Sequence, residues 1–209
     1  KVKKAGGLCI ADEVQTGLGR LGEVYFGFEQ QKVDPDIVVL GKPIGNGHPI
    51  GVVITKSKIA KSFDNGIEFF STFGGSDLSC KIANEVLNIV DDESLKENAK
   101  KMGNILISEL QNLKSKFPII GDVRGLGLFL GVEIITNIQT KEPGTLEAEY
   151  ICNRMREKRI LVGLEGPSEN VIKIRPPLCI SKRDVLTFIH IFSDILDDSC
   201  LKLKSKKLC

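Results

Sequence analysis

Histidine and paired cysteines are scarce in this sequence, which limits the metal chemistry available to it. The 209 residues include two histidines and six cysteines, and no two cysteines form a CxxC pair. Zinc sites draw their ligands mainly from His and Cys at short spacings. We therefore expect no metal site. The cysteines are predicted to be free buried thiols in a reducing compartment; they are Cys9, Cys80, Cys152, Cys179, Cys200 and Cys209.

Long apolar runs and concentrated charge are lacking as well. No stretch approaches the roughly 20 apolar residues that a membrane span needs. The formal net charge is +2, from 29 basic and 27 acidic residues, and the basic residues are spread out until the C-terminal tail. A nucleic-acid surface would gather them on one face. We expect neither a membrane nor a nucleic acid as partner. The sequence opens on KVKKAGG, so we expect any targeting segment to lie upstream, with a mitochondrial or cytoplasmic location.

Hydrophobic periodicity predicts an α/β protein of two domains. Apolar runs at 8–14, 36–40 and 50–55 are typical of strands in a mostly parallel sheet that is covered on both faces. Helical spacing follows at 77–90, with Asp77 as N-cap, and at 94–116, ended by Pro118. Strands at 119–123, 128–135, near Leu161 and at 171–174 accompany helices at 146–158 and after Ser181. We expect part of a large domain over 1–93, a small α+β domain over 94–198 and a basic tail over 199–209.

Two glycine-rich segments could suggest a nucleotide site, and both have simpler explanations. GLGRLG (17–22) satisfies the dinucleotide fingerprint, which requires a helix N-terminus aimed at the pyrophosphate. The residues after it show no helical stripe, and the acids before it would repel phosphate. GLGLFLG (125–131) has the wrong spacing and lies within a strand pattern. We expect close backbone packing there instead.

The ends of the first two strands carry the residues of most chemical interest. Asp12 and Glu13 follow the first apolar run, and a lone lysine, Lys42, follows the second. A snorkelling lysine would explain Lys42 taken alone. Parallel strands, however, bring their carboxyl ends to one rim of the sheet. A desolvated lysine can form an imine, and a carboxylate can keep the ring nitrogen of pyridoxal phosphate (PLP) protonated. Asp12 and Lys42 together therefore predict a PLP site.

Three motifs, IADEVQTGLGR, LGKPIGNGHPIG and STFGGSDLSC, resemble in this order those of the class III PLP-dependent aminotransferases, a fold type I group. The resemblance runs from Gly6 to about Leu196 and covers the C-terminal half of a family member. It implies that Asp12 pairs with the pyridine nitrogen and that Gln15 hydrogen-bonds the phenolic oxygen of the ring. It also implies that Lys42 is the Schiff-base lysine and later the proton shuttle.

The same resemblance implies a homodimer with active sites at the interface. Thr72 corresponds to a threonine that reaches the cofactor phosphate of the neighbouring subunit. Glu13 and Arg20 match motif positions too, and for each a structural ion pair or solvent exposure is an equally good explanation.

Within the class, GKPIGNGHP, GDVRGLGLFLGVE and NVIKIRPPLC resemble most the phospho-lyase branch (alanine–glyoxylate aminotransferase 2-like). That branch acts on phosphoethanolamine or 5-phosphohydroxylysine. Aminotransferases usually carry an arginine where Lys173 stands, and lysine cannot fork onto a carboxylate. Lys173 and the nearby Arg175 are therefore candidate residues for a substrate phosphate, although a solvated strand end explains both equally well.

Two other functions stay open at this point. An ω-aminotransferase that uses pyruvate or glyoxylate would need the same core machinery. An inactive dimerisation remnant is the other possibility, because the glycine turn and the stacking aromatic of the family's N-terminal half are absent here.

Overall fold

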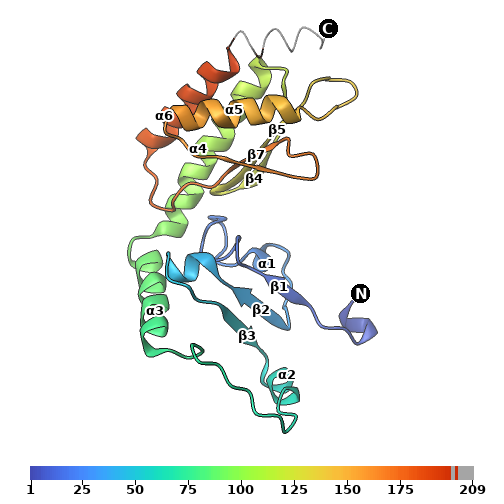
Figure 1. The fold of residues 1–209 in the computed structure, drawn as a ribbon, viewed down its shortest axis with the longest axis vertical. Coiled ribbons are helices and arrows are strands. Elements are labelled where there is room, and N and C mark those ends of the chain that lie inside the picture. The colour runs from blue at the N-terminus through green and yellow to red at the C-terminus, as the bar shows by residue number, and fades with distance from the viewer. Residues whose placement is uncertain (199–200, 202–209) are drawn as a thin grey trace. The chain divides into compact units, whose positions relative to one another are not determined.

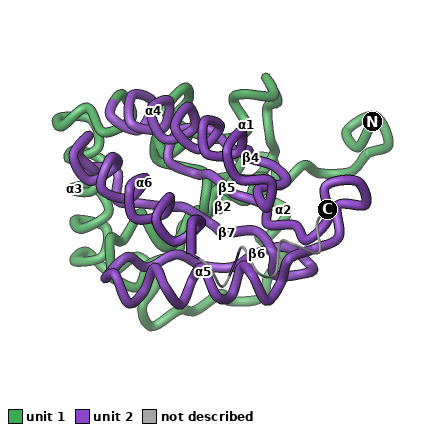
Figure 2. The backbone as a smooth tube through the Cα atoms, turned by 90° about the horizontal axis from the view of Figure 1, so that it is seen from above, with its two compact units in different colours: residues 1–97 green, residues 98–209 purple. Residues whose placement is uncertain are grey.

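The computed structural model describes residues 1–198 and 201, and these form two compact units (Figures 1 and 2). Unit 1 comprises residues 1–97 and unit 2 residues 98–209. The basic tail predicted over 199–209 lies outside the described residues, apart from Leu201. Within the described part of the chain, no helix is both long and apolar enough to cross a membrane.

Unit 1 is built on a three-stranded sheet in the order β1 (Ile10–Asp12), β2 (Ile37–Leu40) and β3 (Val52–Thr55). β1 and β2 are parallel, with Asp12 opposite Val39, whereas β2 and β3 are antiparallel. The sheet predicted as mostly parallel is thus mixed within this chain. The connection over 41–51 is shorter than the dozen or more residues that a parallel crossover needs, so β3 returns antiparallel.

Short helices and one long helix complete unit 1: the 3₁₀ turns η1 (Lys3–Ala5) and η2 (Lys42–Gly45), and the helices α1 (Gly27–Gln30), α2 (Ser57–Ser62) and α3 (Asp77–Asp92). Asp77 is not the N-cap that the sequence predicts. Ser76 holds that position, without a side-chain bond, and Asp77 is the first helical residue. A carboxylate is favourable there because it faces the positive end of the helix dipole.

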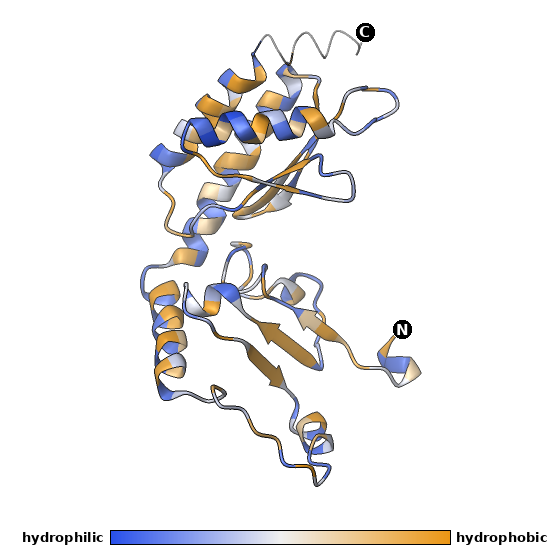
Figure 3. Cartoon of the chain, in the orientation of Figure 1, coloured by the Kyte–Doolittle hydropathy of each residue, from blue (hydrophilic) through white to orange (hydrophobic). Residues whose placement is uncertain are grey.

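The core of unit 1 is small. Its fully buried apolar cluster consists of Leu18, Leu40, Ile44 and Ala83. The strands are apolar along their length (Figure 3), yet Ile10, Val53 and Ile54 are exposed. Leu78 and Ile89, two apolar residues of α3, are exposed as well. Within the described residues, this sheet is therefore not covered on both faces.

Unit 2 has a self-contained core between a sheet and three helices. The antiparallel sheet runs β4 (Ile120–Leu126), β5 (Phe129–Ile134), β7 (Val171–Ile174) and β6 (Gly163–Glu165), and α4 (Leu95–Lys116), α5 (Thr145–Glu157) and α6 (Lys182–Leu196) cover one face (Figure 1). Strand alternation directs Leu130, Val132 and Ile172 into this core, where Leu110 and Phe192 meet them from the helices.

Most sequence predictions for unit 2 are confirmed. α4 ends at Lys116, two residues before Pro118. Ser181 caps α6, its hydroxyl accepting a hydrogen bond from the backbone N–H of Asp184 at 3.2 Å. The strand predicted near Leu161 begins only at Gly163, and Leu161 itself is exposed.

The glycines of 125–131 serve close packing, as predicted. A Cβ placed on Gly103 of α4 would lie 2.2 Å from the carbonyl oxygen of Gly127 in the β4–β5 turn. Gly125 and Gly127 both have positive φ, at 136° and 53°. Only glycine on both sides lets the helix backbone approach the turn this closely.

The four cysteines that lie in the described residues are free thiols, as predicted, but none is fully buried. Cys80 and Cys179 are exposed, and Cys9 and Cys152 are half-buried. Burial raises the pKa of the Cys152 thiol to about 11, so this thiol stays protonated and unreactive at neutral pH. Cys200 and Cys209 lie outside the described residues.

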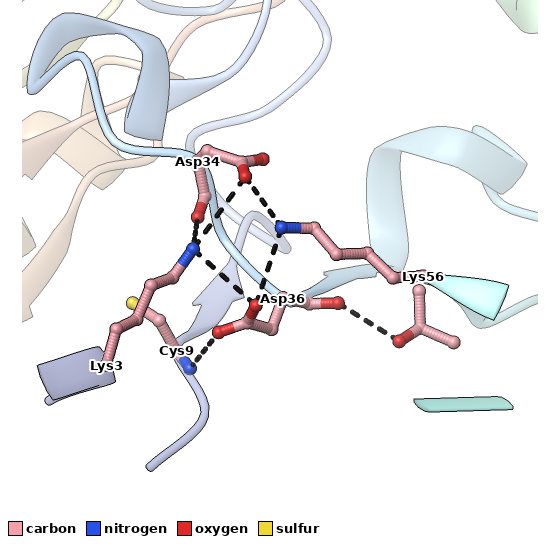
Figure 4. A network of polar contacts seen from close by, with 6 residues as sticks. Lys3, Cys9, Asp34, Asp36 and Lys56 are labelled. Carbon is pink, nitrogen blue, oxygen red and sulfur yellow. Dashed lines mark hydrogen bonds and ion pairs between the residues drawn. The ribbon is translucent and has the colours of Figure 1, made fainter. Parts of the chain in front are cut away.

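A four-residue ion-pair network joins three segments at the N-terminal side of β2 (Figure 4). Lys3 and Lys56 each contact both Asp34 and Asp36, and the closest pair is Lys56 Nζ to Asp34 Oδ2 at 2.6 Å. Asp36, with 12% of its side chain exposed, also accepts the backbone N–H of Cys9 at 2.9 Å. That bond, followed by the two lysines, holds the pKa of Asp36 below its usual value.

Replacing Asp36 by Asn should lower the melting temperature of the protein in a pH-dependent way. A carboxyl group with a lowered native pKa stabilises the fold above its ordinary value of about 3.8, and this contribution is lost as the pH falls through the native pKa. The drop in melting temperature caused by D36N should therefore be largest at pH 6 and should shrink steadily below about pH 3.8. Calorimetric melting curves across this range measure it. D64N, at an exposed aspartate, is the matched control, and an equal D36N deficit at every pH would contradict the prediction.

Candidate functional site

An acid and an amine lie at one edge of the unit 1 sheet. Asp12 is the last residue of β1, and Lys42 is the second residue after the end of β2. Because β1 and β2 are parallel, with Asp12 in register with Val39, both side chains start from the carboxyl edge of the same strand pair. Both residues are exposed in this chain.

The two neighbouring carboxylates at the end of β1 have different environments. Glu13 is buried, with 3% exposure, and accepts hydrogen bonds from the Thr16 hydroxyl at 2.6 Å and from the backbone N–H groups of Gly27 and Phe28 at 2.8 Å each. Glu13 is therefore neither exposed nor dependent on an ion pair. Its carboxylate is satisfied by neutral donors, which offset the cost of burying it.

Glu13 also explains why GLGRLG is not a dinucleotide site. A short helix, α1, does follow that segment, which the sequence analysis did not anticipate. Its first N–H groups, however, bind the Glu13 carboxylate. The positions that a pyrophosphate would need are thus filled by the protein's own anion.

Asp12 is the carboxylate that remains available. Its Oδ1 accepts the backbone N–H of Val14 at 3.1 Å, a local bond that fixes the side chain at the strand end. Among residues 1–198 it forms no ion pair. Asp12 itself is exposed, and of the two adjacent acids only Glu13 is buried.

The backbone holds Lys42 in an unusual conformation. Its φ of 39° lies in the left-handed region, which is costly for a residue with a side chain. The turn is anchored by Ile44, with 2% exposure, and by the N–H of Ile44, which donates to the Gly41 carbonyl at 3.2 Å. Within the described part of the chain Lys42 has no carboxylate partner, so its amine is available for chemistry.

The remaining predicted residues of unit 1 lie in two places. Gln15 is half-buried and follows Asp12 by three residues, within the turn that Glu13 organises. Arg20 is half-buried further along that segment. Thr72 is exposed in the segment between α2 and α3, beside the exposed rings of Phe70 and Phe73.

The two predicted substrate residues belong to unit 2. Lys173 lies on β7 and pairs with Glu165 of the neighbouring strand β6. Its register partners are the glycines Gly131 and Gly163, so no side chain stands directly opposite it on either neighbouring strand. The guanidinium of Arg175 lies 6.0 Å from the ring centre of Phe129, at the limit of a cation–π contact.

Alternation places Lys173 and Arg175 on one face of this sheet. Ile172 and Ile174 point into the core, so the side chain of Lys173 leaves from the opposite face. Phe129, two residues before Gly131 on β5, shares that face with it, and Arg175 lies over Phe129.

The residues at the sheet edge fit PLP. The cofactor needs a carboxylate for its ring nitrogen and a primary amine for its aldehyde. Asp12 and Lys42, at the ends of adjacent parallel strands, carry groups of these two kinds, and Gln15 lies three residues from the acid. In the described residues no cluster of three metal-ligating side chains competes with this assignment.

Two contacts of this region are not predicted from the sequence. The anchoring role of Glu13 depends on N–H groups 14 and 15 residues away, which no local pattern announces. His48 forms a hydrogen bond with Ser79 at 2.8 Å, between positions 31 residues apart. The repeated turn residues of GNGHP were the available sign that this loop is tightly constrained.

Comparison with known proteins gives consistent results. The family model "Aminotransferase class-III" matches residues 2–196. The chain is 45% identical to "Alanine–glyoxylate aminotransferase 2-like" of Drosophila melanogaster, covering 93% of this chain and 40% of that protein. It is 48% identical to "Alanine–glyoxylate aminotransferase 2 homolog 2, mitochondrial" of Arabidopsis thaliana, covering 88% and 38%.

Among solved structures, a phospholyase from Arthrobacter in complex with phosphoethanolamine superposes with a TM-score of 0.89 at 36% identity. The match covers 93% of this chain and 46% of that one. Measured against the two curated relatives, the chain spans about two fifths of their length. The α/β, fold type I architecture is confirmed. The chain belongs to the class III aminotransferase family, whose members depend on pyridoxal phosphate.

Proposed function

We propose that the intact protein is a PLP-dependent enzyme whose site is built on Asp12 and Lys42. The observation that carries this proposal is their position at one carboxyl edge, each without an ionic partner in the described residues. An exposed acid and an exposed amine so placed are available to a bound group that needs both.

Each residue of the site has a distinct task in this proposal. When bound, PLP supplies an aldehyde for the amine and a protonated ring that stores electrons. Asp12 would accept the hydrogen bond of the ring N–H and keep that nitrogen charged, and Gln15 would donate to the phenolic oxygen. The Lys42 amine would hold the cofactor and, once free, would take the proton from the amine-bearing carbon of the substrate.

We propose further that the substrate is an O-phosphorylated amine such as phosphoethanolamine or 5-phosphohydroxylysine. The similarity to the phospholyase supports this assignment, as does Lys173, a point charge suited to phosphate. Lys42 would take the carbon-bound proton, and phosphate would leave the next carbon with the electrons of the C–O bond that breaks. One water then completes the reaction to aldehyde and ammonia.

An aminotransferase that uses pyruvate or glyoxylate is the second candidate. The names of the curated relatives favour it. The same Lys42 would return the proton at another position when no leaving group is present, so the substrate alone separates the two reactions.

The site as proposed requires two copies of the chain. Thr72 would donate its hydroxyl to the cofactor phosphate of the partner subunit. The exposed rings of Phe69, Phe70 and Phe73 around it support a surface that a second copy covers. A mitochondrial location is proposed from the name of the Arabidopsis relative.

Borohydride reduction of the PLP-loaded protein should fix a pyridoxyl group on Lys42, because reduction makes the lysine–cofactor bond permanent. Peptide mapping by mass spectrometry locates it. K42A should carry no such group, whereas K101A, which removes an exposed lysine of α4, should be labelled as the wild type is. Absence of label at Lys42 in the intact protein would overturn the enzyme proposal in favour of an inactive remnant.

Replacing Lys173 by Ala should raise KM for the phosphorylated amine and leave labelling of Lys42 unchanged. A charge-assisted hydrogen bond contributes roughly 1.5–3 kcal/mol, which corresponds to a change of about tenfold or more. Phosphate release from phosphoethanolamine and from 5-phosphohydroxylysine measures the effect, with K101A again as control. Amino transfer to pyruvate or glyoxylate without any phosphate release would establish the aminotransferase instead.

Mixed dimers test the role of Thr72. K42A and T72V homodimers should each be impaired, the first without activity. A heterodimer of the two contains one site with both Lys42 and Thr72 intact if Thr72 serves the partner. Unfolding and refolding an equimolar mixture should therefore restore about a quarter of the wild-type activity, since half of the dimers are mixed and each has one intact site. Recovery no greater than the mean of the separate homodimers would exclude a role across the interface.

A further inference from the structure

The loop that carries Lys42 is fastened to α3 by one side-chain hydrogen bond. His48 Nε2 lies 2.8 Å from the Ser79 hydroxyl, and both residues are partly buried. His48 has no role in the chemistry proposed above. It lies in the same loop as Lys42, six residues later, where its side chain can hold the loop in place.

The loop between these two residues is a chain of tight turns with little freedom. Asn46 N–H donates to the Pro43 carbonyl at 3.1 Å, and His48 N–H donates to the Gly45 carbonyl at 2.9 Å. A Cβ on Gly45 would lie 2.7 Å from the Ile50 side chain. If His48 moves, Lys42 should move with it, because hydrogen-bonded turns and no flexible segment connect the two residues.

Ser79 ties this loop to a second predicted element of the site. It lies in the first turn of α3, directly after the segment that carries Thr72. Residues 48–53, 73–76 and 78–80 line a cavity of about 870 Å³, and the His48–Ser79 bond connects the two parts of this lining. Ile44 of the Lys42 turn and Ala83 of α3 belong to the same buried cluster.

We propose that His48 is a positioning residue, whose bond to Ser79 holds the Lys42 loop and the Thr72 segment in one fixed arrangement. This inference rests on the function proposed above. Lys42 would serve the site of its own subunit and Thr72 that of the partner, so the bond links the geometry of two neighbouring sites. Its strength matters because Lys42 is held in a left-handed conformation that nothing in its own side chain favours.

Two replacements of His48 distinguish the effect of the hydrogen bond to Ser79 from the effect of the space that the imidazole ring fills. A glutamine amide nitrogen reaches about as far as Nε2 and can meet the Ser79 hydroxyl, whereas the shorter asparagine places its nitrogen near Nδ1 and cannot. H48N and S79A should slow the fixation of PLP on Lys42 and lower kcat by about tenfold or more, with little change in KM. H48Q should restore most of the rate of PLP fixation and most of kcat. N84A, at an exposed position of α3, is the control.

The double variant and hydrogen exchange complete the test. H48N/S79A should be no worse than either single variant, since both remove the same bond. Amide exchange of the cofactor-free protein should rise in 42–50 and in 71–80 for H48N and S79A, and in neither segment for H48Q.

Equal behaviour of H48Q and H48N, or wild-type rates in H48N and S79A, would overturn the inference and leave the proposed function standing. Failure of the wild type to fix PLP on Lys42 would overturn both.

Discussion

The parallel pairing of β1 with β2 is the constraint on which the rest of this molecule depends. It aligns Asp12 with Val39 and so brings the end of one apolar strand next to the end of another. An acid and an amine separated by 30 residues in sequence thereby start from one edge. Within the described residues neither takes part in an ion pair, so both remain available to the cofactor of the proposed function.

Asp12 and Glu13 are adjacent at the end of β1, yet their surroundings differ. Asp12 is the last residue of β1 and is exposed, whereas Glu13, directly after the strand, is buried. Glu13 turns inward and binds the start of α1, which fixes the segment that contains Gln15. Its burial therefore helps to shape the segment that carries the residues of the proposed site.

The two units differ in how fully they bury their apolar residues. Unit 2 closes its sheet under three helices and has a large continuous core. Unit 1 has a four-residue core, and most of the exposed large apolar side chains belong to it, including the rings around Thr72. Exposed apolar surface of this extent is typical of an interface. This asymmetry agrees with a site assembled from more than one copy of the chain, whereas unit 2 can rely on its own packing.

The sequence by itself determined the family, the helices and strands of unit 2, and the candidate residues Asp12, Gln15, Lys42 and Thr72, because local periodicity and contiguous motifs carry that information. It could not determine which of the two adjacent acids is buried, because the donors that satisfy Glu13 come from 14 and 15 residues away. Nor could it reveal the ion pair of Lys173 with Glu165 or the bond of His48 to Ser79, which depend on strand register and on helix packing. Only the tertiary structure decided these, since each requires two segments to meet that no local pattern connects.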